Sequence, residues 1–186
     1  MKKLLFCLSI LASSILASAQ ETTFKPFKFD IATGYAVPGG SGTKGGLILA
    51  FEPKYALNDN ITVGFRWEGA VMVRANVDAN GDAVKGDAKA SGSYLLTGDY
   101  YFNTNSFRPF AGIGAGLYRN AAVRLESDDM EGDMQTSAKF GFAPRAGFEY
   151  GHFRTAIEYN VAGKAGNINN NYLGIKLGFF IGGGRY

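Results

Sequence analysis

The sequence contains very little cysteine or histidine. Cys7 is the only cysteine and lies in an N-terminal segment that we expect to be removed, and His152 is the only histidine. A mature chain without cysteine has no disulfide framework, no thiol nucleophile and no cysteine-based metal site. We therefore expect no metal or other cofactor.

The chain also lacks a strong excess of charge of one sign. It has 19 basic and 16 acidic residues, and losing Lys2 and Lys3 with the N-terminal segment leaves 17 basic residues and a net charge of +1. This balance gives no electrostatic basis for binding nucleic acid, so we expect no nucleic-acid partner.

The N-terminal apolar run is too short to cross a membrane as a helix. It covers residues 4–16, about 13 residues, whereas a membrane-spanning helix needs roughly 20. A basic Met-Lys-Lys start precedes the run, and the Ala-Ser-Ala of residues 17–19 follows it as a small-residue cleavage site. The pattern predicts a cleaved secretory signal peptide over residues 1–19 and one domain over residues 20–186.

Glycine and aromatic residues are abundant, and the rest of the chain alternates with period two. Glycine accounts for 26 of 186 residues and aromatics for 14%, a combination typical of curved strands with aromatic girdles. The clearest alternation covers residues 61–74, where one face is free of charge. Eight such segments are predicted as strands: 27–37, 46–57, 61–74, 93–102, 107–118, 139–150, 153–161 and 172–181.

The connections between these segments alternate between short and long. Three are short turns of turn-forming residues, and four are longer and polar. The short ones are 58–60, 103–106 and 151–152, and the long ones are 38–45, 76–88, 119–137 and 163–170. This layout is typical of an eight-stranded antiparallel transmembrane β-barrel with short periplasmic turns and longer extracellular loops.

A soluble lipocalin-like barrel is the alternative, because its strands alternate as well. In such a barrel the charged faces would be the solvated outside, and alternation alone does not separate the two designs. The aromatic excess, the export signal, the loop asymmetry and the last strand favour the membrane barrel.

Two stretches resemble the small eight-stranded barrels of the bacterial outer-membrane superfamily, of the OmpA, OmpX and OmpW type. They are the closing segment 172–181, which resembles a C-terminal recognition strand, and the hairpin over residues 100–116. The chain departs from that pattern by continuing through residues 182–186. The resemblance implies an outer-membrane location, outer-membrane lipid and the barrel-assembly machinery as partners, and an extracellular ligand of the loops that the sequence does not identify. Its implied roles range from envelope integrity and adhesion to minor permeation and lipid-modifying catalysis.

The charged residues of the strands all fall on the polar faces, which a membrane barrel turns inward. There are nine basic and six acidic ones: Lys28, Asp30, Glu52, Lys54, Arg66, Glu68, Arg74, Asp99, Arg108, Lys139, Arg145, Glu149, Arg154, Glu158 and Lys176. Because a buried charge is costly without a partner, they must pair with each other or with water. One interpretation is a salt-bridged plug with a structural role, and the other is a narrow channel favouring small anions. Within this set we expect Glu52 to pair with Arg66 on the neighbouring strand.

Patterns that point to catalysis or metal binding are weak. His152 is expected in a turn at the periplasmic end, without a nucleophile close by, and a solvent-exposed turn residue is the simpler interpretation. Four acidic residues, Asp128, Asp129, Glu131 and Asp133, lack the order of a calcium-binding loop. We therefore expect a non-enzymatic protein.

Overall fold

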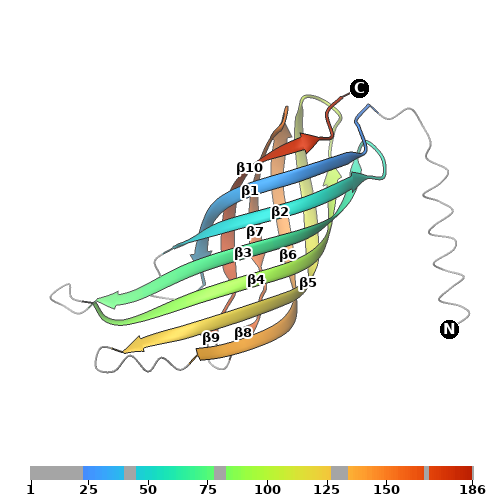
Figure 1. Cartoon of the computed structure of the whole chain (residues 1–186). Helices are drawn as coiled ribbons and strands as arrows, with labels where there is room; N and C mark the ends of the chain where they lie inside the picture. Colours follow the sequence, from blue (N-terminus) through green and yellow to red (C-terminus); the bar gives the residue numbers. More distant parts are fainter. Residues whose placement is uncertain (1–22, 40–44, 78–82, 127–133, 166–167, 186) are drawn as a thin grey trace, which may run out of the picture.

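The computed structural model describes residues 23–39, 45–77, 83–126, 134–165 and 168–185, which form a closed barrel (Figure 1). Eight antiparallel strands close it in the order β1-β10-β7-β6-β5-β4-β3-β2, which confirms the predicted fold class. The barrel strands are β1 (Phe27–Pro38), β2 (Gly46–Ala56), β3 (Ile61–Val77), β4 (Ala83–Tyr101), β5 (Phe107–Glu126), β6 (Met134–Tyr150), β7 (Phe153–Asn160) and β10 (Tyr172–Gly182). Two-residue strands β8 (Lys164–Ala165) and β9 (Ile168–Asn169) form a small separate hairpin.

The first and last barrel strands close the sheet along a continuous seam. Phe29 pairs with Ile181 at one end of the seam, and Val37 pairs with Leu173 near the other. Because the side-chain period of a strand is two, this register keeps the apolar residues of both strands on the outer face. Every barrel strand therefore has a paired neighbour on each side over part of its length, and no strand is an edge strand throughout.

The outer surface is apolar and the interior is charged. Leu96 and Phe140 are 70% and 74% exposed, whereas Arg66 and Glu158 are 1% and 0% exposed. A soluble barrel has the opposite arrangement, so this distribution favours the membrane barrel over the lipocalin-like alternative. Within the described residues, no helix is long and apolar enough to cross a membrane.

Strands β3 to β6 extend further than the sequence predicted (Figure 1). The segments 76–88 and 119–137 were expected to be loops, but pairs such as Lys85–Glu126 and Val123–Met134 continue the ladder through much of both. Near the start of these extensions the outward positions Ala90, Arg119 and Ala121 are no longer large and apolar, so the hydrophobic alternation ends before the hydrogen-bonded pairing does. Segment 163–170 likewise contains β8 and β9. The acidic stretch 127–133 lies outside the described residues.

Close packing inside the barrel requires glycine at particular points. A Cβ atom on Gly112 would lie 2.1 Å from the Asp99 carboxylate and 2.5 Å from a backbone oxygen, and one on Gly147 would lie 2.0 Å from the Thr155 backbone oxygen. The inner-facing glycine of β5 therefore leaves room for a charged side chain of β4 in a narrow lumen.

Candidate functional site in the barrel lumen

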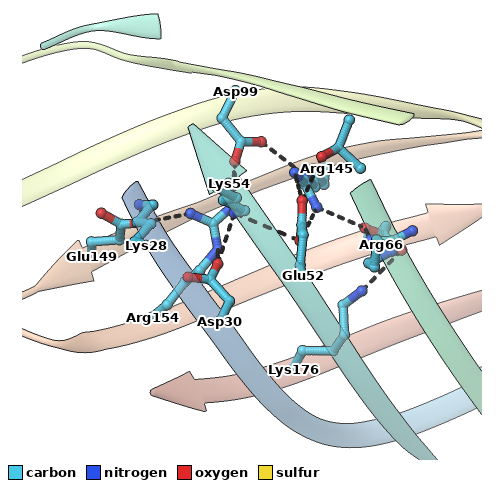
Figure 2. Close-up of polar contacts among 12 residues, drawn as sticks. Lys28, Asp30, Glu52, Lys54, Arg66, Asp99, Arg145, Glu149, Arg154 and Lys176 are labelled. Carbon is cyan, nitrogen blue, oxygen red and sulfur yellow. Dashed lines mark hydrogen bonds and ion pairs between the residues drawn. The ribbon is translucent and has the colours of Figure 1, made fainter. Parts of the chain in front are cut away.

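The predicted lumen residues come together in one buried group (Figure 2). We call the ion-paired set the lumen network: Lys28, Asp30, Glu52, Lys54, Arg66, Glu68, Asp99, Arg108, Arg145, Glu149, Arg154, Glu158 and Lys176. Each member is at most 6% exposed. Arg74 lies in β3, but its side chain is outside the described part of the chain. Lys139 is not a member of the network. It is exposed, and it lies toward the end of β6 at which the long connections of the barrel begin.

Arg145 of β6 lies at the centre of the network (Figure 2). Its Nη1 and Nη2 donate to the two carboxylate oxygens of Glu52 at 3.0 and 2.7 Å, and its Nε donates to Asp99 Oδ1 at 2.7 Å. Such a two-pronged arrangement uses the planar shape of the guanidinium and is among the stronger protein hydrogen-bond geometries. One residue thus ties together β2, β4 and β6.

Lys54 and Arg154 share the second oxygen of Asp99. Lys54 Nζ lies 3.0 Å from Asp99 Oδ2 and 2.8 Å from Asp30 Oδ2, while Arg154 Nη2 donates to Asp99 Oδ2 at 2.8 Å. Arg154 also lies over the ring of Phe110, 3.7 Å from its centroid. The Asp99 carboxylate therefore has three cationic partners.

The opposite side of the network is built around two glutamates. Lys176 Nζ donates to Glu68 at 2.7 Å and to Glu158 at 3.0 Å, and Arg66 forms an ion pair with Glu158. The Tyr172 hydroxyl donates to the other Glu68 oxygen at 2.6 Å. Each carboxylate here has a cation and a second donor, as buried charges require.

The prediction that Glu52 forms an ion pair with Arg66 is wrong, although the register between β2 and β3 is as expected. Flanking pairs Phe51–Trp67 and Lys54–Gly64 put the two residues opposite each other. Glu52 nevertheless binds Arg145 on β6, and Arg66 binds Glu158 on β7. In a lumen this narrow, long side chains reach residues across the barrel, and adjacency along one hairpin does not reveal such contacts.

A small cavity remains within the network. It measures about 30 Å³ and is lined by charged residues and by small ones such as Ala50 and Gly178. Among its lining atoms, Asp30 Oδ1 and Arg66 Nη2 have no hydrogen-bond partner in the described structure. The cavity has room for one or two water molecules, which would satisfy these atoms.

Buried apolar groups lie beside the charged network. The first contains Ile48, Met72 and Tyr172, and the second contains Leu95 and Tyr118. These side chains fill lumen space next to the ion pairs, and the tyrosine hydroxyl groups donate to polar neighbours, Tyr172 to Glu68 and Tyr118 to Asn160.

A short N-terminal segment is held at the end of the barrel with the short turns. The backbone amides of Thr23 and Phe24 donate to the Asp59 carboxylate at 2.9 to 3.2 Å, and Phe24 pairs with Arg185 near the C-terminus. Burial alone would raise the pKa of Asp59, but these hydrogen bonds and the charge of Arg108 hold it below its ordinary value of 3.8. Both described ends of the chain therefore lie at the short-turn end.

The structure is similar to that of solved outer-membrane barrels. No protein-family model matches the sequence, and no curated protein matches it. Neisserial surface protein A has a TM-score of 0.59 and 18% identity, covering 84% of this chain and 96% of that one. OprG of Pseudomonas aeruginosa has a TM-score of 0.48, 15% identity, and coverage of 85% and 97%. Ail of Yersinia pestis in complex with the heparin analogue sucrose octasulfate has a TM-score of 0.46, 16% identity, and coverage of 84% and 99%. At the level of fold, the comparison confirms the predicted resemblance to small outer-membrane barrels.

Sequence reasoning missed the hydroxyl groups of the network. Tyr101 OH donates to Glu149 at 2.6 Å and accepts from Lys28 and Arg154, each at 2.8 Å. Strand parity already put Tyr101 and Tyr172 on the inner faces, which is a signal that they are buried. A buried tyrosine hydroxyl usually has a hydrogen-bond partner. The inward position of both tyrosines therefore predicts that their hydroxyl groups belong to the lumen network.

Proposed function

We propose that this chain is a non-enzymatic outer-membrane barrel with a structural or surface-interaction role and a lumen closed by ion pairs. The observation that carries the proposal is the lumen network, whose members come from strands all around the barrel and are at most 6% exposed. The apolar exterior supports outer-membrane lipid as its surroundings. Export by a signal peptide over residues 1–19, and insertion by the barrel-assembly machinery, complete the proposal.

Opening a pore would require breaking several buried ion pairs at once. Removing one partner of such a pair typically costs about 3 to 5 kcal/mol, because the other charge is left without compensation. Arg145 alone contacts Glu52 and Asp99, and moving it aside would strand both carboxylates. The geometry thus supports a closed barrel more strongly than a standing channel.

A narrow channel for small anions is the second candidate. The lumen network contains seven cations and six carboxylates, a small excess of positive charge. Such an excess would favour anions if the lumen opened.

The closed barrel and the narrow channel differ in whether small solutes can pass through the lumen. We expect liposomes containing the purified protein to swell in acetate or chloride solutions no faster than empty liposomes, because the network leaves only about 30 Å³ free. The measurement is the rate of light-scattering change, with a known open porin as positive control. Swelling that depends on the protein and is faster for acetate than for a cation of similar size would support the channel instead.

The proposed location and orientation predict a labelling pattern. Because the mature chain has no cysteine, single cysteines can be introduced at Lys164 and at Asn105 without a competing thiol. We expect Lys164→Cys, in the β8–β9 hairpin, to react with a membrane-impermeant maleimide on intact cells, and Asn105→Cys only after the outer membrane is permeabilised. The reverse pattern would contradict the orientation, and reaction of neither variant after permeabilisation would contradict exposure of both sites.

A further inference from the structure

A second cavity lies at the short-turn end of the barrel, apart from the lumen network's centre. It measures about 150 Å³, and we call it the mouth pocket. Its lining comes from the N-terminal segment, the β4–β5 and β6–β7 turns, the neighbouring ends of β5, β6 and β10, and the C-terminal tail. The lining includes Arg108, Glu149, Gly151, His152, Gly184 and Arg185. The volume is below the roughly 300 Å³ of pockets for drug-sized ligands, so only a small molecule fits.

Two arginines, each with its guanidinium group near the ring of Phe24, line the mouth pocket. Arg108 is 6% exposed and is held between two rings, with its guanidinium carbon 3.9 Å from the centroid of Phe24 and 4.2 Å from that of Tyr101. Its Nη2 donates to the Asp59 backbone oxygen at 2.5 Å, while its Nε is buried without a hydrogen-bond partner in the described structure. Arg185 is exposed, lies 5.5 Å from the Phe24 centroid, and donates from Nη2 to the Thr104 backbone oxygen at 2.6 Å, which leaves its other N–H groups for a ligand. Together they suit a carboxylate.

Unused acceptors line the same pocket. Glu149 Oε1 receives hydrogen bonds from Lys28, Tyr101 and Arg154. Glu149 Oε2 is buried and has no hydrogen-bond partner among the described residues, and Arg108 Nη1 lies 3.8 Å from it as an ion-pair partner. His152 Nδ1 lies 2.9 Å from the Phe180 carbonyl oxygen and must donate to it, so Nε2 of the neutral ring is an acceptor. A plain anion would leave these acceptors unmatched, whereas an ammonium group would satisfy them.

We propose that the mouth pocket binds a small amino acid as its zwitterion, with the carboxylate on Arg108 and Arg185 and the ammonium group facing Glu149 and His152. The pocket carries two cations and one carboxylate, so a ligand with both charges meets partners of opposite sign at each end. This binding site goes beyond the proposed closed barrel and does not depend on it.

The test uses isotope-labelled mature protein in lipid nanodiscs, titrated with L-alanine and followed by NMR. We expect saturable shifts of the Gly151 and Gly184 amides, and none at Gly92 on the distant part of β4. Acetate and methylammonium, each with one charged group, should bind at least about tenfold more weakly, because one set of charged hydrogen bonds is lost. Absence of saturable shifts with alanine, or acetate binding as tightly as alanine, would overturn the proposal.

Variants at exposed positions keep the test independent of folding. Arg185→Gln and His152→Phe should each weaken alanine binding at least about tenfold, while the phenyl ring preserves the contacts of His152 with Phe179 and Phe180. Arg119→Gln is the matched control, since it removes an exposed arginine on the outer face of β5 and should leave binding unchanged. Unchanged affinity in both mouth variants, with native spectra, would also overturn the proposal.

Discussion

Arg145→Met is expected to destabilise the barrel by about 3 to 5 kcal/mol, a cost typical of removing one partner from a buried ion pair. Methionine keeps much of the side-chain volume but leaves Glu52 without its two-pronged partner and Asp99 without its 2.7 Å contact. Lys54 still lies 3.6 Å from Glu52 and 3.0 Å from Asp99, which keeps part of the compensation. The measurement is the free energy of unfolding in urea, with the protein in phospholipid vesicles.

The matched control is Arg119→Met, which removes an exposed arginine of β5 and should change stability by no more than about 0.5 kcal/mol. The double variant Glu52→Gln with Arg145→Met should lose less than the sum of the two single losses, because each single change strands the other residue. A cost of Arg145→Met below about 1 kcal/mol would instead indicate a water-filled lumen in which solvent screens the charges.

Leu96→Arg is expected to cost up to about 2 to 4 kcal/mol, the penalty for an arginine that faces the hydrocarbon of the bilayer. Leu96 is 70% exposed on the outer face of β4, between the exposed aromatic residues Tyr94 and Tyr100. Aromatic girdles mark the two membrane interfaces, so the position between them faces hydrocarbon. The same urea titration in vesicles measures the effect.

Ala90→Arg is the control for depth on the same strand and face. Ala90 lies about 20 Å along β4 from Leu96, at roughly 3.4 Å per residue. Because Ala90 lies beyond the apolar belt, the substitution should cost no more than about 1 kcal/mol of unfolding free energy. Equal costs at the two positions would indicate an outer surface without a hydrocarbon belt, as in a soluble barrel.

The strands and their inner faces could be predicted because period two is a local property of the chain. Arg145 and Glu149, for example, alternate with Phe142 and Phe148 along β6, and this parity predicted the inward position of the charges. The same reasoning explains why Lys139 was assigned inward although it is exposed. Parity tells which face a residue occupies but not where along the strand the closed lumen ends.

The strand ends and the ion-pair partners could not be predicted from local pattern. Ladder pairing such as Lys85–Glu126 depends on backbone hydrogen bonds, which continue where the side chains no longer alternate between apolar and polar. The contact of Arg145 with Glu52 joins residues far apart in sequence on strands that are not neighbours. Only the closed barrel brings them together.

Single-channel recording in planar lipid bilayers tests the closed lumen most directly. We expect purified wild-type protein to give no stepwise current in about 1 M KCl, so that the recorded current stays at the level of the bare membrane. The reason is that buried ion pairs and apolar groups fill the interior of the barrel. Insertion is checked in the same sample by protection of the strands from added protease. Stable, protein-dependent steps with anion selectivity would contradict the account and establish the lumen as a channel.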